Sequence, residues 1–335
     1  MLFVRIALDA MGGDHAPLEI LKGAALALES DQQLQIILVG NEKAIHENMH
    51  AINLNDSKRV SIVHCEEVIE MDDHPATAYR KKKNASITVA TRLVKDKSAD
   101  AVVSAGSTGG QMVAALFVLG RIQGVERPAI VIDLPTLGGN KILLDGGANS
   151  DSRPQHLQQF ARMGSVYATQ INGAEKPEVA LINIGAEETK GNELTISTYK
   201  LLKEDNKILF TGNIEGREVM AGKADVMICD GFVGNVILKV IEGTSSALFT
   251  LLKQEFTNGI KSKIGAFLLR PRLIELKKRL DYAERGGAPL LGVDGISIIC
   301  HGSSKSLAIK NAIEMAKTCK KNDLIKRLTD SIKSD

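Results

Sequence analysis

The sequence predicts an α/β protein with one mostly parallel sheet of about ten strands and helices on both of its faces. Along the 335 residues, short apolar segments alternate with longer segments whose apolar residues have helical spacing. Most of the apolar segments end in a glycine-rich polar loop. Strands that alternate with helices form parallel sheets, and such sheets bind ligands at the carboxyl ends of their strands. We therefore expect a single domain, 1–335, whose polar loops converge on one cleft.

Ten segments of four to six residues carry the pattern of a buried strand. In chain order they are 3–8, 35–39, 60–63, 101–104, 129–133, 142–145, 179–184, 208–211, 226–229 and 296–300. The stretch 286–289, Gly-Gly-Ala-Pro, is predicted to be one more polar loop between two of these elements.

The stretch 224–243 combines a strand, a glycine turn and a helix start. The apolar run 226–229 leads into the turn 230–235, and apolar residues at helical spacing follow from Val236, with Asn235 as the expected N-cap. Free backbone N–H groups and the positive end of a helix dipole at one place suit an anion. The alternative is an ordinary turn between a strand and a helix.

A second loop, after the strand 101–104, has the composition of an anion-binding loop. Small and hydroxyl residues there offer backbone N–H groups and side-chain donors, as a phosphate or carboxylate needs. The residues are Gly106, Ser107, Thr108 and Gly109.

Composition excludes several classes of function. The chain has 42 basic and 40 acidic residues, so no global nucleic-acid footprint is expected. Its four cysteines are widely spaced, which predicts buried free thiols in a reducing cytosol. No tight carboxylate cluster occurs, so no metal ion is expected. The G-x-G-x-x-G fingerprint of dinucleotide binding is also lacking, and no organic cofactor is expected. The start of the chain lacks a signal-peptide pattern, and no run reaches the ~18 apolar residues of a membrane span.

The segment 244–280 is predicted to be a helical hairpin. Its first arm has Leu248, Leu251, Leu252 and Phe256 at helical spacing, the dipeptide 258–259 weakens the helix, and Pro271 is expected to mark another break. From 253 to 279 there are eight Lys or Arg and two Glu, and apolar residues lie among them. Such a segment is typical of an interface with anionic lipid, so we expect 256–272 to contact a membrane. The alternative is an amphipathic hairpin packed on a partner subunit.

A run of four basic residues at 80–83 is also prominent. Such a run is usually a solvated surface. The alternative is a docking site for an acidic partner, and the basic segment 270–279 is a second candidate.

Seven loop motifs follow one another along nearly the whole chain. They are 8–17 (LDAMGGDHAP), 104–109 (SAGSTG), 188–193 (ETKGNE), 212–217 (GNIEGR), 230–235 (DGFVGN), 286–292 (GGAPLLG) and 301–304 (HGSS). Together and in this order they resemble the PlsX phosphate acyltransferases of bacterial phospholipid synthesis. Ser107 stands where that family often has Asn, and Gly110 where it often has Ala, and both changes keep the loop small.

The resemblance implies the three-layer α/β/α fold shared with isocitrate dehydrogenases and phosphotransacetylases, with a protruding helical hairpin, and a homodimer. It implies that an acyl group passes from acyl carrier protein to inorganic phosphate, giving acyl phosphate and free carrier protein. A membrane glycerol-3-phosphate acyltransferase would use the product. We accordingly expect a cytoplasmic enzyme associated peripherally with the inner face of the cell membrane.

This reaction asks the protein to hold phosphate against the thioester carbonyl, stabilise the oxyanion and help the thiolate leave. Lys190 is expected to contact phosphate or oxyanion, Asn235 to donate to the oxyanion, and His301 to protonate the thiolate. The plainer alternatives are a surface lysine beside two glutamates, a simple N-cap and a structural histidine. Cys229 ends an apolar strand and is expected to be a core residue rather than a nucleophile.

The remaining candidates for phosphate or substrate binding follow three strands. They are Gly106, Ser107, Thr108, Gly109, Asn213, Arg217, Asp230, Gly231 and Gly234. For Arg217 the alternative is an ion pair with Glu215 or Glu218.

Rival functions remain open from the sequence alone. They are a phosphotransacetylase-like enzyme that uses an acyl-CoA thioester, a metal-dependent hydroxy-acid dehydrogenase of the same fold, and a membrane-bound scaffold without catalytic activity.

Overall fold

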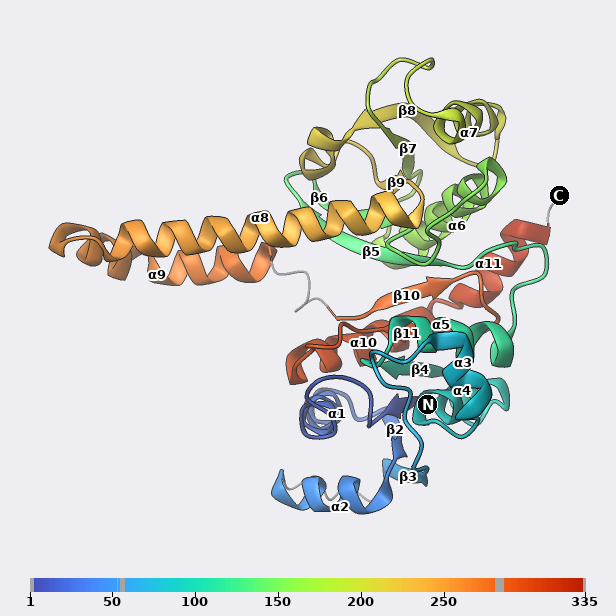
Figure 1. Cartoon of the computed structure of the whole chain (residues 1–335), viewed down its shortest axis with the longest axis vertical. Helices are drawn as coiled ribbons and strands as arrows, with labels where there is room; N and C mark the ends of the chain where they lie inside the picture. The colour runs from blue at the N-terminus through green and yellow to red at the C-terminus, as the bar shows by residue number, and fades with distance from the viewer. Residues whose placement is uncertain (1–2, 53, 55–57, 281–285, 334–335) are drawn as a thin grey trace.

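The structure is a computed structural model that describes residues 3–52, 54, 58–280 and 286–333. Within these residues, eleven strands form one continuous sheet with helices on both faces (Figure 1). The three-layer α/β/α arrangement expected from the sequence is confirmed. The strand order is β3-β2-β1-β4-β11-β10-β5-β6-β9-β7-β8.

The first half of the sheet is entirely parallel. Its strands are β1 (Val4–Asp9), β2 (Leu34–Gly40), β3 (Val60–His64), β4 (Ala101–Ser104) and β11 (Ile296–Ile299). The second half pairs β6, β9, β7 and β8 in parallel as well. These strands are β6 (Gly139–Leu144), β7 (Glu178–Asn183), β8 (Leu209–Glu215) and β9 (Val226–Ile228).

Three reversals separate the two halves. Strand β10 (Ala288–Leu291) is antiparallel to both β11 and β5 (Ala129–Thr136), and β5 is antiparallel to β6. The strands of the second half therefore run opposite to those of the first. The expectation that all polar loops converge on one cleft is wrong, because the carboxyl ends of the two halves lie at opposite edges of the sheet.

Strand β10 was not expected from the sequence. It contains Pro289, which has no N–H to donate, and it follows two glycines, a pattern that favours a loop. Tertiary pairing overrides this local signal: Ala288 and Pro289 pair with Ile299 and Ile298 of β11.

Side chains alternate between two cores, one on each face of the sheet. In β1, Ile6 and Leu8 point into the first core and Ala7 into the second; in β6, Leu144 and Leu143 divide in the same way. The first core is covered by α1 (Leu18–Ser30), α2 (Glu42–Ala51), α6 (Pro154–Asn172), α7 (Glu193–Glu204), α10 (Ser306–Lys321) and α11 (Leu324–Lys333). The second is covered by α3 (Pro75–Lys81), α4 (Ser86–Lys95), α5 (Thr108–Ala114), the π-helix η1 (Ala115–Leu119), the 3₁₀ helix η2 (Gly216–Ala221) and the first turns of α8 (Gly231–Thr257).

Helix α8 crosses the second face and then leaves the body of the protein (Figure 1). Its outer half packs on α9 (Ile260–Leu280), so that residues 244–280 form the expected hairpin. The break between the arms lies at Asn258 and Gly259, as expected. The second break expected at Pro271 is wrong, because Pro271 lies inside α9 and the helix continues through it.

Candidate active site

The carboxyl ends of β9, β7 and β8 form one edge of the sheet and carry seven of the candidate residues. Strand β9 is followed by Asp230 to Asn235, strand β7 by the loop with Lys190, and strand β8 contains Asn213 and is followed by Arg217. Neighbouring strands lie about 4.8 Å apart, so adjacent strand ends bring these loops together.

A buried carboxylate organises this edge next to β6. Asp145 is fully buried, and its two oxygens accept backbone N–H bonds from Ile130, Gly147, Ala148 and Asn149 at 2.8–3.1 Å. The amide of Asn149 adds another bond at 2.8 Å. Burial raises the pKa of Asp145, and these hydrogen bonds act in the opposite direction. The carboxylate therefore fixes the turn 146–149 onto the start of β5.

The start of α8 is pressed against this turn. A Cβ on Gly231 would lie 2.8 Å from an Asp145 side-chain oxygen, and one on Gly234 would lie 1.9 Å from the Asp145 carbonyl oxygen. Only glycine fits at these two positions because the helix backbone approaches the turn so closely. The N-cap is Asp230, whose side chain accepts the N–H of Val233 at 2.8 Å.

The prediction that Asn235 caps the helix is therefore wrong. Helix α8 begins at Gly231, five residues before the expected start at Val236, and Asn235 lies in its second turn. Its side chain is exposed, and a Cβ on Gly147 would come within 3.5 Å of it. Among the described residues, its amide group has no hydrogen-bond partner.

Two asparagines hold the loop that carries Lys190. The amide of Asn183 donates to the Lys190 carbonyl, and the amide of Asn213 donates to the Glu187 carbonyl, each at 3.0 Å. Both asparagines are buried, so Asn213 acts here as a support for the loop.

The ammonium group of Lys190 is exposed and has no ion pair within the described part of the chain. Glu188 pairs with Lys203 instead, at 2.6 Å, which leaves Lys190 free of it. The edge therefore presents two unpartnered donors, a cation and a neutral amide, on two neighbouring strand ends.

Arg217 and Asp230 have partners of their own. Arg217 donates to Glu215 at 2.9 Å, the alternative considered from the sequence, and its side chain is 78% exposed. Asp230 is occupied as the N-cap of α8.

The opposite edge of the sheet holds the loop 104–110. Ser104 donates to the buried carboxylate of Asp9 at 2.7 Å and accepts the N–H of Gly106 at 3.0 Å. Ser107 caps α5 by accepting the N–H of Gly110 at 3.3 Å, while Thr108 is exposed. Burial raises the pKa of Asp9, and its bond to Ser104 acts in the opposite direction. The structure thus places Gly106, Ser107, Thr108 and Gly109 apart from Lys190 and Asn235.

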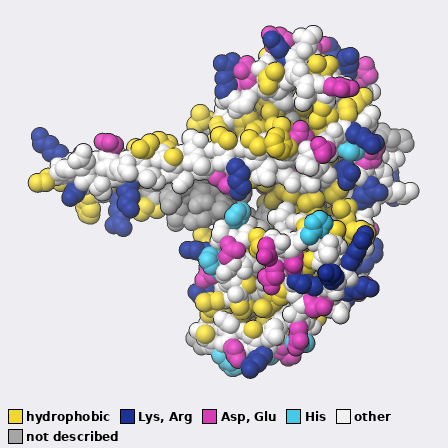
Figure 2. Space-filling model, viewed as in Figure 1, with side chains coloured by type: hydrophobic (Ala, Val, Ile, Leu, Met, Phe, Trp, Pro, Cys, Tyr) yellow, Lys and Arg dark blue, Asp and Glu magenta, His cyan; other side chains and the backbone are white. Residues whose placement is uncertain are grey.

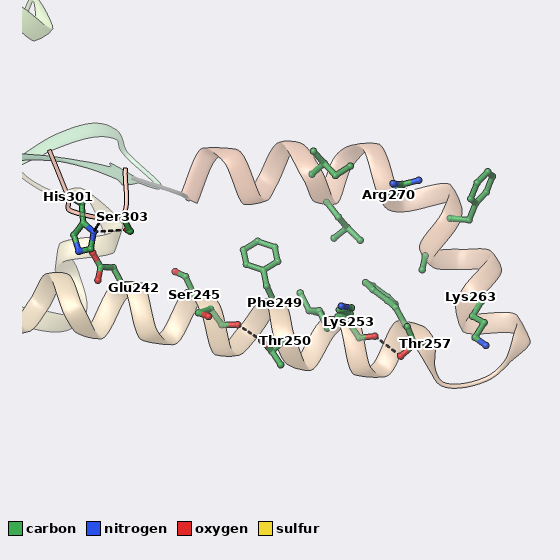
Figure 3. A pocket seen from close by; sticks show the side chains of 17 residues that line it. Glu242, Ser245, Phe249, Thr250, Lys253, Thr257, Lys263, Arg270, His301 and Ser303 are labelled. Atoms are coloured by element: carbon green, nitrogen blue, oxygen red, sulfur yellow. Dashed lines mark hydrogen bonds between the residues drawn. The ribbon is translucent and has the colours of Figure 1, made fainter. Parts of the chain in front are cut away.

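His301 also lies at this second edge, after β11. Its Nδ1 accepts the N–H of Ser303 at 3.3 Å and lies 2.8 Å from the Ser303 hydroxyl, so in the neutral ring Nε2 carries the proton. Figure 3 shows His301 beside Glu242, at the start of the fourth turn of α8. The structure does not bring His301 to Lys190. His301 lies beside Glu242, which follows Asn235 by seven residues and is therefore about 10 Å from it along the axis of α8.

The cysteines behave as expected. All four are free and buried, and all lie in the described residues. Burial raises the pKa of the Cys229 thiol well above its usual value, with Asp145 adding to the shift, so the group stays protonated. Within the described residues, no cluster of His, Cys, Asp or Glu is arranged to hold a metal ion.

Comparison with known proteins identifies the family. The model of the family described as "Fatty acid synthesis protein" matches residues 4–327. The phosphate acyltransferase of Heliobacterium modesticaldum is 56% identical over 98% of both chains. The chain belongs to the phosphate acyltransferase family. Other members include those of Desulforamulus reducens, 52% identical over 99% of this chain and 98% of the other, and Clostridium perfringens, a putative enzyme 46% identical over 98% and 97%.

Solved structures agree on the fold. A phosphotransacetylase from Streptococcus pyogenes has a TM-score of 0.59 at 15% identity, covering 99% of this chain and 95% of that chain. The EutD phosphotransacetylase from Staphylococcus aureus has a TM-score of 0.57 at 15% identity, with 94% of each chain covered. The phosphate acyltransferase family thus shares its architecture with phosphotransacetylases, as the sequence motifs implied.

Sequence reasoning missed two supports of the site, Asp145 and Asn183. A signal for the first was present, because Asp145 follows a strand and opens the polar turn Gly-Gly-Ala-Asn. No local signal marks Asn183, which is the last residue of a buried strand and acts through a loop seven residues away.

Proposed function

We propose that this protein transfers a fatty acyl group from acyl carrier protein to inorganic phosphate and releases acyl phosphate and free carrier protein. Membership of the phosphate acyltransferase family supports the acyl transfer to phosphate. The observation that carries the site assignment is the pair of free donors, Lys190 and Asn235, on neighbouring strand ends at one edge of the sheet.

In this reaction a phosphate oxygen attacks the thioester carbonyl carbon, an oxyanion forms, and the carbon–sulfur bond breaks to release a thiolate that takes up a proton. The Lys190 ammonium attracts the phosphate dianion and reduces its repulsion from the developing oxyanion. The Asn235 amide donates to the oxyanion without bringing a charge of its own. The buried thiol of Cys229 takes no part, so no acyl-enzyme is needed.

The test is an assay with palmitoyl carrier protein and phosphate, in which acyl phosphate is measured. Lys190→Ala and Asn235→Ala are each expected to lower turnover ~10²–10³-fold, the usual cost of one oxyanion donor. Lys203→Ala is the matched control, because Lys203 is also an exposed lysine near this loop but is paired with Glu188. Near-normal turnover in a folded Lys190 or Asn235 variant removes that residue from the site.

The phosphotransacetylase neighbours favour one second candidate, transfer from an acyl-CoA thioester. The same assay separates the two donors. Turnover of acyl-CoA with none of acyl carrier protein would support the second candidate. Turnover of NAD with a hydroxy acid would overturn both.

We also propose that the hairpin tip, 256–272, contacts the inner face of the membrane. Helix α8 is long and apolar enough to cross a membrane by length and composition alone, and 6% of its most apolar window is buried. Its first turns are nevertheless anchored on the sheet, which supports a peripheral role rather than a span. At the tip, Ile260, Phe267 and Leu268 are exposed by 70–80%, next to Lys261 and Arg270. Exposed apolar residues among cations suit anionic lipid.

A Phe267→Glu, Leu268→Glu double variant tests this. We expect it to lose co-sedimentation with anionic vesicles while its dimer state and its activity in solution persist. Binding as strong as that of the wild type would exclude the tip as the anchor, and loss of the dimer would assign the tip to subunit packing.

We propose that the outer face of α8 forms the interface of a homodimer. Phe232, Val236 and Val240 are 65%, 47% and 59% exposed and form a stripe at four-residue spacing (Figure 2). Light scattering of Val236→Glu should report a monomer if this stripe is the interface.

The acyl phosphate made at the site would then pass to a membrane glycerol-3-phosphate acyltransferase.

A further inference from the structure

We propose that a pocket between the loop 121–128 and the start of α6 binds a small organic molecule that carries a phosphate or diphosphate group. This site goes beyond the acyl transfer proposed above, and Lys190 does not line it. The pocket has a volume of about 630 Å³, and three arginines line it, which are Arg121, Arg127 and Arg153. Its size lies in the usual range of pockets for small organic ligands, roughly 300–1,000 Å³.

Two of the three guanidinium groups are free. Among the described residues, the side chains of Arg127 and Arg153 have no hydrogen-bond partner and no ion pair, and both are exposed. Arg121 donates to the carbonyl of Glu126 at 2.5 Å, which holds that side chain in place. A guanidinium presents paired N–H donors in one plane, and these fit two oxygens of a phosphate group. The pocket therefore offers two unoccupied phosphate-binding groups beside a third that is already fixed.

The charges of these arginines act on a histidine that lines the same pocket. His156 is 5% exposed, and burial lowers its pKa. The positive charges of Arg127 and Arg153 lower this pKa as well, while Glu126 acts in the opposite direction. Both guanidinium groups therefore lie close enough to His156 to repel a proton there. In the neutral ring, Nδ1 accepts the N–H of Arg153 at 3.1 Å and Nε2 donates to Glu126 at 3.1 Å.

The lining has an excess of positive charge. The three arginines face two carboxylates, those of Glu126 and Asp151, and Glu126 is engaged by His156. The start of α6 adds to the excess, because its N-cap residue is Arg153, whose side chain has no acceptor for the N–H groups of the first turn. These N–H groups form the positive end of a helix of 19 residues. The pocket therefore favours an anion over a cation.

The loop wall of the pocket is held in place before a ligand binds. Gln159 of α6 accepts the N–H of Glu126 and donates to the carbonyl of Gly124, each at 2.9 Å. The N–H of Ile122 donates to the carbonyl of Gly292, directly after β10, at 3.0 Å. These bonds fix the loop to α6 on one side and to the sheet on the other, so binding requires little ordering of the backbone.

The rest of the lining suits the organic part of a phosphorylated molecule. Leu116 and Pro128 give apolar surface. The half-buried Ser152 lines the pocket too, and its hydroxyl has no hydrogen-bond partner among the described residues. Rotation of this side chain to another rotamer would turn the hydroxyl toward a ligand. Phosphate-binding groups thus lie beside apolar surface and a spare donor.

One residue, Asn149, joins the pocket to the Asp145 turn. Its amide donates to the carbonyl of Pro128, which lines the pocket, at 2.7 Å and to the carboxylate of Asp145 at 2.8 Å. The carbonyl of Asn149 accepts the N–H of Gly231, the first residue of α8, at 2.8 Å. A ligand in the pocket therefore lies next to the turn on which α8 rests, without contact to Lys190.

Calorimetric titration of the full chain tests the site, with pyrophosphate, ADP and adenosine as probes. The titrations use the Lys190→Ala background, so that anion binding at the proposed site of acyl transfer does not contribute. We expect saturable binding of pyrophosphate to a single site, tighter binding of ADP because its organic part contacts the apolar surface, and no binding of adenosine.

Variants at the two free arginines locate the binding. Arg127→Ala and Arg153→Ala should each weaken pyrophosphate binding ~10-fold or more, the usual effect of losing a hydrogen bond to a charged group. The urea midpoint should stay unchanged, because neither side chain has a partner to lose. Arg153→Lys keeps the charge but not the paired donors, so it should weaken binding as well. Arg80→Ala is the matched control, because Arg80 is an exposed arginine in the basic run 80–83 and should not affect the affinity.

The pKa of His156, followed by NMR, is a second readout that binding elsewhere on the surface would not change. A bound phosphate group offsets the repulsion from Arg127 and Arg153, so saturation with pyrophosphate should raise this pKa. His156→Gln identifies the signal, and His46, which is exposed on α2, is the internal control.

The outcomes separate this inference from the proposed function. Weaker pyrophosphate binding in the Arg127 and Arg153 variants, with the Arg80 variant unchanged, supports the site even if no acyl donor is turned over. Equal affinity in all of these variants, equal weakening in all of them, or no saturable binding overturns it even if the enzyme is active. Binding of ADP no tighter than that of pyrophosphate would overturn the organic part and assign the pocket to an inorganic anion.

Discussion

A single methyl group at Gly234 should test whether α8 positions the active site. A Cβ built there lies 1.9 Å from the carbonyl oxygen of Asp145 and 3.2 Å from the sulfur of Cys229. Contacts of a real Cβ start near 3.0 Å, so Gly234→Ala requires the helix or the turn to move by roughly 1.1 Å, the difference between those two distances. The neighbour is backbone held by a buried carboxylate, which cannot rotate away as a side chain can.

Two effects should follow from this displacement. Overpacking of this kind costs ~1–3 kcal/mol, offset by about 1 kcal/mol from the better helix propensity of alanine. Asn235 is the next residue, so a displacement near 1 Å should misplace its amide and lower turnover ~10²-fold. We therefore expect the loss of turnover to exceed what the loss of stability explains.

Gly243→Ala is the matched control in the same helix. A Cβ at Gly243 meets no atom within 4 Å, and its backbone is ordinary helix, so the substitution should stabilise the protein by ~0.5–1 kcal/mol and leave turnover unchanged. The assay pairs the urea midpoint with acyl phosphate formation at 25 °C. If Gly234→Ala is as stable and as active as Gly243→Ala, the close approach of α8 to the Asp145 turn does not exist as described.

Three further predictions concern docking, pH and thiol chemistry. Arg80, Lys81 and Lys83 are exposed where basic side chains gather over α3 and α4 (Figure 2). Reversing their charges should raise the KM for acyl carrier protein and flatten its salt dependence. An unchanged KM would favour docking at 270–279 instead, of which the side chains of 277–279 lie outside the described residues. Lys82 is the contrasting position, because it bonds Asp73 at 2.5 Å and the Val68 carbonyl at 2.8 Å, so Lys82→Ala should lower the urea midpoint instead. Burial lowers the pKa of His156 in the folded state, and the contact with Glu126 acts in the opposite direction. As the pH drops, the unfolded state therefore takes up the proton of His156 before the folded state does. The free energy of unfolding should fall as the pH drops below about 6.5. A His156→Gln variant should lose less stability than the wild type between pH 8 and pH 5, and equal losses would contradict this sign. Because all four thiols are buried and protonated, iodoacetamide at pH 7 should leave turnover intact, and rapid inactivation that phosphate prevents would return Cys229 to the active site.

Local patterns in the sequence predict most of the fold. All ten expected strands are present, since each is a short apolar run between polar loops, and residues 244–280 form the expected hairpin. The observed starts and ends of elements differ from the predicted ones by a few residues. In α8, for example, two residues of a type that caps helices, Asp230 and Asn235, lie within one span of six residues. The outcome is decided by tertiary contact: Gly231 and Gly234 fit the helix against the Asp145 turn, which no local pattern contains.

The direction of the strands is the part that local pattern cannot supply. The sequence pattern of ten strands that alternate with helices is the same whether the sheet is parallel throughout or changes direction at its centre. The net reversal comes from the antiparallel hairpin of β5 and β6. Strand β10 does not add to it, because β10 is antiparallel to both of its neighbours and leaves β5 running in the same direction as β11. The unexpected antiparallel pairing of β5 with β6 therefore separates two edges whose polar loops were expected to converge on one cleft.

With the reversal in place, a single helix connects the chemistry of the two edges. Helix α8 starts at the edge that carries Lys190 and Asn235 and passes His301 at Glu242 about 16 Å later, measured from Gly231 at helical rise. Because its first turn is fixed by the Asp145 turn and its fourth turn meets the β11 loop, the helix cannot rotate about its axis without losing one contact or the other. The orientation of α8 is therefore set at the active site, and a substitution at either contact should lower turnover.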